Sequence, residues 1–287
     1  MGKISINALS AYDTVLKVSL LFVGRKAMYI YIMGYFKKLI RPYLLWSVVL
    51  IVIPLLMIFL YAFTQSGNSL LNIQFTLDNF IKFADEVYVE VFVESFKLGL
   101  LTVIICFFLG YTLAYIISRF SEKLQSFLIL LVTIPMWINM IIRIYAWKSI
   151  LEPLGLMYTD FAVMVGQICE FLPFMVIPIH TSLSKMDKSL IEASYDLGAT
   201  HFQTFVRVIF KLSIPGVING IIMVFLLSVS TFMIPQILGG GQYILIGNLI
   251  EKQFIEGGDW NFGSAVSLVL AVIILLLIRW MKKVDKE

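Results

Sequence analysis

The chain has 287 residues, of which 60% are hydrophobic and only 14% are charged, and its mean hydropathy is +0.93. A soluble domain carries about 25% charged residues, so this composition excludes an ordinary soluble protein. The net charge of +4 is small and comes with no basic patch interleaved with aromatic residues, so we expect no nucleic acid among the partners.

Six apolar runs of about the length that crosses a bilayer predict an all-α integral membrane protein. Residues 38–287 show neither an internal repeat nor a glycine–serine linker, which predicts one transmembrane domain. Residues 1–37 are predicted to be a cytoplasmic or interfacial N-terminal extension. The predicted spans are 44–63, 98–118, 124–147, 161–180, 217–239 and 262–278.

Polar residues beside the spans predict where helices begin. Thr76 or Asp78 is the predicted cap of a helix in the first loop. Asp259 is the predicted cap of the sixth span, and Trp260 is expected to lie in the membrane interface. The glycines at 239–241 predict a turn, and no G-x-x-x-x-G-K-[ST] sequence follows that would make it a phosphate loop.

Lysine and arginine are distributed unequally between the two sides of the membrane. Segments 1–42, 119–123, 185–216 and 279–287 would share one side, and they hold 17 of the 22 lysines and arginines. Most of the acidic residues lie in the segments of the opposite side. Because basic loops stay in the cytoplasm, both termini and the segment 185–216 are predicted to be cytoplasmic.

The polar segment between the fourth and fifth spans predicts two short helices. Ser189 with Glu192, and Thr200 with Gln203, have the spacing of capping boxes. Gly198 lies between them, where a left-handed cap at a helix end favours glycine. The pattern indicates an elbow of two helices on the membrane surface, a shape that suits docking to a soluble partner.

Polar groups within the spans are candidates for a substrate path. Glu170 lies in the middle of the fourth span, where an acid costs about 2.5–3.5 kcal/mol and is expected to face the bundle interior or water. A permeating cation would offset that cost, and a hydrogen-bonded structural glutamate is the alternative. Asn139 is predicted to line the path, whereas Arg143 is expected to reach headgroups or a carboxylate. Trp137, Tyr145 and Asp259 complete the candidates, although Tyr145 also fits an aromatic belt.

The residues that usually carry catalysis or bind metals are sparse. His180 and His201 are the only histidines, and neither has a partner at ligand spacing. Cys106 and Cys169 lie within spans and are predicted to be free, buried thiols. No serine or cysteine stands in a nucleophile elbow. We therefore predict no catalytic, metal or cofactor site in this chain. Because the chain has no nucleotide site of its own, we expect the energy for its function to come from another subunit.

The segment Glu192-Ala193-Ser194, followed by Gly198, resembles the cytoplasmic E-A-A-x-x-x-G signature of ABC importer permeases of the MetI-like family. Lys211 stands where the signature has a proline, so the second helix is expected to continue until Pro215 ends it. In that family the loop docks into a cleft of the ATPase subunit. The resemblance implies this coupling role for Glu192, Ala193, Ser194, Asp196, Leu197, Gly198 and Ala199.

Other phrases are similar to the polyamine-type branch of that family. Residues 134–147 match its P-x-W-x-x-x-x-[IV]-R-x-Y-x-W phrase, and residues 171–175 match L-P-F-M. Residues 245–254 are similar to L-I-G-N-x-I-x-x-Q-F, and residues 259–263 to D-W-P-F-G. These phrases occur in the order that the family shows.

The resemblance implies a six-helix permease of the bacterial cytoplasmic membrane that takes up spermidine or putrescine by alternating access. It implies three partners besides lipid: an ATPase homodimer that binds ATP-Mg, a second homologous permease, and an extracytoplasmic solute-binding protein. Relatives that carry ferric iron or phosphonates leave other cargoes open. Two other classes of protein stay open. One is a secondary transporter or channel, in which inverted repeats are expected, and the other is a membrane-bound assembly or signalling factor.

Overall fold

A computed structural model describes residues 40, 42–65, 74–241, 243–256 and 258–284. The predicted extension, residues 1–37, lies outside these residues. The chain divides into two compact units, Met1–Met57 and Ile58–Glu287, and the boundary falls within the first long helix. That helix begins at Pro42, contains a π-helical turn, η1 (Val48–Val52), and continues as α2 (Ile53–Ala62), whose residues from Ile58 onward belong to the second unit.

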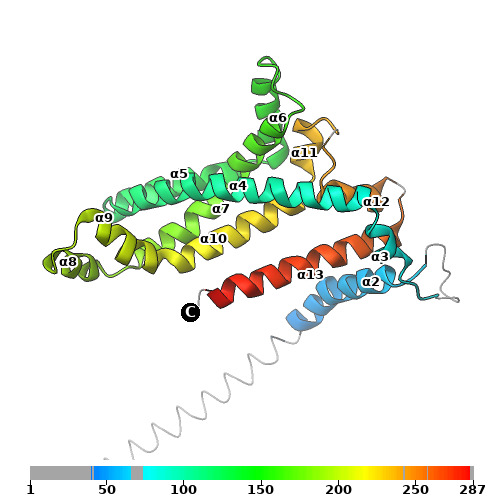
Figure 1. Cartoon of the computed structure of the whole chain (residues 1–287), viewed down its shortest axis with the longest axis horizontal. Coiled ribbons are helices and arrows are strands. Elements are labelled where there is room, and N and C mark those ends of the chain that lie inside the picture. The colour runs from blue at the N-terminus through cyan, green and yellow to red at the C-terminus, as the bar shows by residue number, and fades with distance from the viewer. Residues whose placement is uncertain (1–39, 41, 66–73, 242, 257, 285–287) are drawn as a thin grey trace, which may run out of the picture. The chain divides into compact units, whose positions relative to one another are not determined.

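The described part of the chain is almost entirely helical (Figure 1). Among the described residues, five helices are long and apolar enough to cross a membrane, and a bent pair makes a sixth crossing if it counts as one span. The helices after the first are α3 (Asp78–Phe83), α4 (Glu86–Ser118), α5 (Glu122–Trp137), α6 (Met140–Leu151), α7 (Asp160–Ser184), α8 (Lys188–Asp196), α9 (His201–Thr204), η2 (Phe205–Ile209), α10 (Phe210–Ser230), α11 (Met233–Leu238), α12 (Ile246–Ile255) and α13 (Trp260–Val284).

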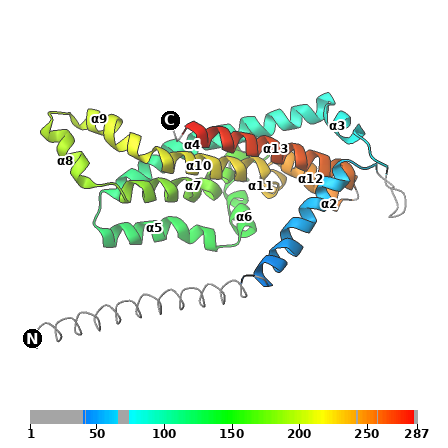
Figure 2. The same cartoon turned by 90° about the horizontal axis from the view of Figure 1, so that it is seen from below.

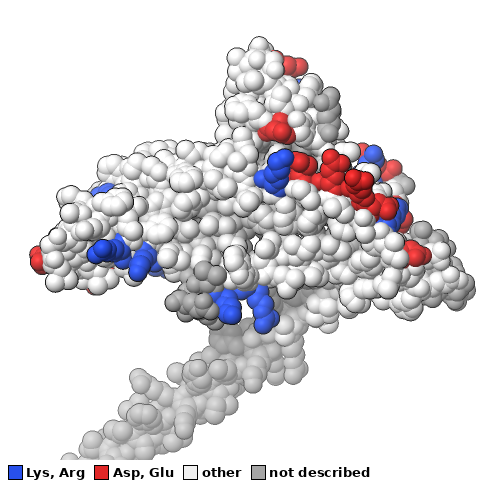
Figure 3. Space-filling view, in the orientation of Figure 1, with Lys and Arg blue, Asp and Glu red and all other residues white. Residues whose placement is uncertain are grey.

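The second predicted span is longer in the structure, because α4 begins at Glu86 and not near residue 98. Apolar side chains of its first turns, including Tyr88, Val91 and Phe92, pack against a buried cluster of residues from α10, α12 and α13. Glu86, Glu90 and Glu94 follow each other at four-residue spacing on the exposed face. Figure 3 shows acidic side chains gathered in this part of the surface. The alternation of charged and apolar residues before position 98 therefore belongs to a helix with one exposed, charged face and one packed, apolar face.

The third predicted span, 124–147, is not one straight helix. α5 and α6 meet at an angle of 90°. Asn139 lies at the break, and its side chain accepts a hydrogen bond from the Ile141 N–H at 2.9 Å, which caps α6. Ile138 before it is extended, with ψ of 139°, which ends α5. The break therefore has a local cause, since a capping asparagine starts a new helix.

The fifth predicted span, 217–239, is displaced towards the N-terminus. The helix runs without interruption from His201 to Ser230, breaks at Thr231, and resumes as the separate helix α11. Pro215 lies inside α10 and does not end it, so that prediction was wrong. Gly216 packs so closely on α7 that an added Cβ would lie 2.5 Å from the Pro178 carbonyl oxygen. Packing on α7 thus keeps the segment around this proline helical.

Helices α4, α7 and α10 run side by side and form the core of the second unit (Figures 1 and 2). Met175 of α7 is fully buried between Gly110 of α4 and Gly220 of α10, where an added Cβ would approach its side chain to 2.8 and 2.7 Å. Small residues allow this close approach of helices in a membrane. The buried Gln167 side chain accepts a hydrogen bond from Thr102 at 2.7 Å and donates to the Ser228 carbonyl at 3.3 Å, which links all three helices.

Two buried asparagines hold the segment that follows α2. The Asn79 side chain donates to the carbonyls of Ala62 and Thr64 at 3.1 and 3.0 Å. The Asn261 side chain donates to the carbonyl and the hydroxyl of Thr64, both at 2.8 Å. Asp259 accepts hydrogen bonds from the N–H groups of Asn261 and Phe262, which confirms the predicted cap of the sixth span.

Candidate functional site

The predicted elbow is present as α8 and α9, joined by a turn at Gly198. Gly198 has φ of +80°, the left-handed conformation predicted for it. The Thr200–Gln203 capping box is confirmed, because the Gln203 N–H donates to the Thr200 hydroxyl at 3.3 Å and the Thr200 N–H to Gln203 Oε1 at 3.0 Å. The Ser189–Glu192 box was wrong. Asp187 caps α8 instead, accepting from the Ser189 N–H at 2.9 Å.

Side chains of the two elbow helices are tied together. The hydroxyls of Ser194 and Thr204 are 2.9 Å apart, and Tyr195 Oη lies 2.9 Å from His201 Nδ1. Thr204 is fully buried. Since α9 continues without a break through η2 into α10, the elbow is a rigid extension of a membrane-spanning helix.

Apolar side chains project from the tip of the elbow. Leu197 is 89% exposed and Phe202 is 76% exposed. Glu192, Ala193, Asp196 and Gly198 are also exposed, whereas Ser194 and Ala199 are half-buried. All seven residues of the predicted coupling motif therefore lie on the elbow, with an apolar projection beside two carboxylates.

The π-helical turn η2 joins the elbow to the core. Its Phe205 ring packs edge-on against Tyr111 and Tyr115 of α4, with centroid distances of 5.9 and 5.3 Å. Tyr111 Oη also lies 3.0 Å from Ser213 Oγ in α10. Motion of the elbow would therefore reach both α10 and α4. The sequence pattern did not show this contact, because the tyrosines read only as apolar positions of a span.

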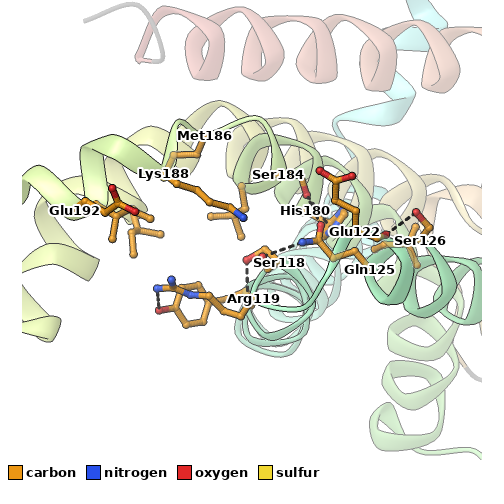
Figure 4. A pocket seen from close by; sticks show the side chains of 15 residues that line it. Ser118, Arg119, Glu122, Gln125, Ser126, His180, Ser184, Met186, Lys188 and Glu192 are labelled. Atoms are coloured by element: carbon orange, nitrogen blue, oxygen red, sulfur yellow. Dashed lines mark hydrogen bonds between the residues drawn. The ribbon is translucent and has the colours of Figure 1, made fainter.

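A cavity of about 650 Å³ opens beside α8, between that helix, the turn from α4 to α5, and the end of α7 (Figure 4). The Lys188 side chain points from α8 into it. On the opposite wall, Arg119 donates a hydrogen bond to Tyr115 Oη at 2.6 Å, and Glu122 begins α5. α8 makes its main contacts with α9 and η2, so the cavity leaves this helix free of tight packing against α5.

The predicted path residues fall into two groups. Arg143 Nη2 donates a hydrogen bond to Glu170 Oε1, which joins α6 to α7 and confirms that Arg143 reaches a carboxylate. Asn139 is occupied as the cap of α6. Trp137 and Tyr145, around the same bend, are 78% and 52% exposed.

Asp259 belongs to a different group from the other path candidates. It caps α13 and lies 3.6 Å from the Lys82 amino group of α3. Within the described residues, the structure gives it contacts with neither α6 nor α7. The contacts of Asp259 are therefore those of a structural residue at the start of the last span.

Comparison with known proteins identifies a matching family and similar sequences. Residues 106–287 match the family described as "Binding-protein-dependent transport system inner membrane component". The spermidine/putrescine transport system permease protein PotB of Salmonella typhimurium (strain SL1344) is 36% identical over 255 residues, covering 82% of this chain and 89% of the relative. The protein of the same name from Escherichia coli (strain K12) is 35% identical over 268 residues, covering 84% and 98%.

A solved structure shares the fold. It is a bacterial alginate ABC transporter in complex with an alginate pentasaccharide-bound periplasmic protein, with a TM-score of 0.68 and 16% sequence identity over 88% of this chain and 96% of that one. At this identity the likeness shows the fold alone. The family match covers more than half of the chain and the two PotB relatives exceed 30% identity. The chain therefore belongs to the family of inner-membrane components of binding-protein-dependent transport systems.

Proposed function

We propose that this chain is the membrane-spanning subunit of an ATP-driven importer for spermidine and putrescine. The two PotB relatives support the cargo, because their alignments cover more than four fifths of this chain at 35–36% identity. The chain itself hydrolyses no ATP. A separate ATPase homodimer binds ATP-Mg, a second homologous permease completes the path, and a solute-binding protein delivers cargo on the outer side.

The observation that carries the proposal is the exposed, rigid elbow. Leu197 and Phe202 form an apolar projection that fits a cleft in a soluble subunit, as buried apolar anchors do at protein interfaces. ATP-driven movement of that subunit then shifts α8 and α9. The shift passes through η2 to α10, and through Tyr111 and Tyr115 to α4. The outer and inner ends of the path open alternately as these helices move.

The first test is uptake of labelled spermidine and putrescine into proteoliposomes that hold the complete complex. We expect uptake that requires internal ATP and that either polyamine inhibits. Uptake that persists without the ATPase would contradict the proposal in favour of a secondary transporter. ATP-dependent uptake of ferric iron or a phosphonate, with no polyamine uptake, would contradict the cargo alone.

The second test addresses the elbow. Leu197→Asp places a charge at a side chain that is 89% exposed, so the fold is preserved while the interface is lost. We expect recovery of the ATPase subunit in co-purification to fall about tenfold. Ile255→Asp is the matched control, because Ile255 is 72% exposed at the end of α12, outside the elbow. Equal recovery from both variants would contradict the docking role.

A further inference from the structure

Glu170 and Arg143 form an ion pair inside the membrane-spanning part of the second unit. Glu170 comes from the middle of α7, and Arg143 from the first turns of α6, beyond the 90° bend. Their side chains are only 11% and 16% exposed. Ionisable side chains within membrane-spanning segments are expensive to keep out of water and typically mark functional positions.

The pairing is incomplete on both sides. Arg143 Nε is buried and has no hydrogen-bond partner in the described part of the chain. Only Oε1 of Glu170 accepts from the guanidinium, and Oε2 makes no hydrogen bond there, although it is not enclosed. An arginine that serves only to neutralise a carboxylate commonly binds both oxygens in a fork. Here the carboxylate keeps one oxygen open to a second donor.

The surroundings suit an organic cation. α6 contacts both α7 and α11, and α11 is separated from α10 by the non-helical residues at Thr231 and Phe232. Aromatic side chains of the same bend, Trp137 and Tyr145, are exposed, and aromatic faces attract ammonium groups. The Lys148 amino group already lies 5.9 Å from the Tyr145 ring centroid. The open oxygen of Glu170 is an acceptor for an aliphatic ammonium, and the exposed rings at the bend are further groups that attract one.

We propose that Glu170 binds an ammonium group of the cargo and that Arg143 is a resident cation which the cargo displaces. This inference rests on the proposed function, because it assumes a polyammonium substrate. Exchange of one cation for another keeps the buried carboxylate compensated throughout, and the displaced guanidinium is the charge that loses its partner until it returns. Return of Arg143 to Glu170 then favours release. α6 moves with Arg143, so cargo binding would also loosen α6 from α7.

The test is the kinetics of polyamine uptake by Glu170→Gln and Arg143→Gln in the reconstituted complex, with assembly checked by co-purification. We expect Glu170→Gln to raise KM about tenfold or more, because a charge-assisted hydrogen bond to the cargo is lost. Arg143→Gln is expected to lower KM and also the maximal rate, because the competing cation is gone and release slows. The double variant is expected to have the KM of Glu170→Gln. Lys97→Gln, which breaks the exposed Lys97–Glu94 pair, is the control and is expected to keep the wild-type KM.

The charge-swapped variant Arg143→Glu/Glu170→Arg separates this proposal from a purely structural ion pair. A structural pair would be restored by the swap, and recovery of wild-type KM and rate would overturn the proposal. We expect the swap to assemble and to remain defective in KM. An unchanged KM in Glu170→Gln would also overturn it. Failure of the wild-type complex to take up any polyamine would instead overturn the proposed function, and this inference with it.

Discussion

Gly198 is the residue at which the two elbow helices meet, and its backbone conformation sets their angle. With φ of +80° and no atom within 4 Å of an added Cβ, Gly198→Ala would be strained but would meet no clash. The left-handed conformation costs an alanine about 1–2 kcal/mol. We expect several-fold lower ATP-dependent uptake, because the elbow relaxes to another angle.

Gly155 supplies the matched control for this change. It has φ of +66°, again with no atom within 4 Å of an added Cβ, but it lies between α6 and α7. Gly155→Ala therefore carries the same backbone strain outside the elbow. ATP-dependent uptake is measured for both variants in parallel. Equal losses of uptake would show that backbone strain alone, and not the geometry of the elbow, limits transport.

Asp187 makes the N-terminal end of the elbow sensitive to pH. Hydrogen bonds from Ser189 hold the pKa of the Asp187 carboxyl below its ordinary value. A lowered pKa in the folded state means that the carboxylate stabilises the capped helix above the ordinary aspartate pKa. This contribution is lost as the pH falls through the lowered value. We expect hydrogen exchange of the peptide around α8 to accelerate between pH 7 and a pH well below the ordinary aspartate pKa of about 3.9, after correction for intrinsic rates.

Asp187→Asn tests the cause of that acceleration. The amide keeps an oxygen that accepts from the Ser189 N–H, but it does not titrate in this range. We expect its corrected exchange around α8 to be the same at both pH values. Acceleration as large as that of the wild-type protein would mean that another group, or the whole bundle, responds to acid.

Packing between α7 and α10 is the element-scale feature that fixes the elbow's direction. A Cβ added at Gly216 would lie 2.5 Å from the Pro178 carbonyl oxygen, a backbone atom, whereas one at Gly220 would lie 2.7 Å from Met175 Sδ. A methionine sulfur moves more easily than a backbone carbonyl. We expect Gly216→Ala to cost about 1–3 kcal/mol and to lower the thermal midpoint of the purified complex more than Gly220→Ala does. The reverse order would mean that α7 bends freely at Pro178.

Local sequence signals predicted most helix positions but not how the helices break or join. Gly198, the Thr200–Gln203 box and the Asp259 cap were predictable, because each depends on residues within four positions. The continuation of α10 through Pro215 depends on contact with Pro178, about forty residues earlier in the chain. The Arg143–Glu170 hydrogen bond likewise joins two residues that are 27 positions apart in the sequence. Such contacts become visible only when the fold is known.

Some misses arose from local rules that competed with each other. Asp187 and Ser189 are both good caps two residues apart, and the structure uses Asp187. Asn139 read as a polar residue of a span, although asparagine is also among the strongest helix-capping residues. Glu86, Glu90 and Glu94 precede the predicted start of the second span at residue 98, yet they lie on one face of the same helix. In each case the residue type fitted two local roles, and the sequence alone did not decide between them.

The orientation of the whole chain depends on whether the bent pair α5–α6 crosses the membrane. If it crosses, there are six spans, and α8 lies on the same side as the turn between α4 and α5. If the pair instead enters and leaves on one side, α8 lies on the side opposite to the turn between α4 and α5. The basic segment that contains α8 would then be separated from the other basic segment at that turn. The distribution of 17 of the 22 basic residues favours six crossings, with the elbow in the cytoplasm.

Single cysteines decide between these two arrangements. In a background without Cys106 and Cys169, Glu122→Cys at the start of α5, Leu154→Cys after α6 and Leu197→Cys at the elbow place a thiol at exposed positions. We expect a membrane-impermeant maleimide to label the cysteine at position 154 in intact cells, and those at 122 and 197 only after the membrane is opened. Labelling of 122 and 154 from the same side would show a re-entrant pair. If both were labelled only after the membrane is opened, the elbow would lie outside, where no ATPase could reach it.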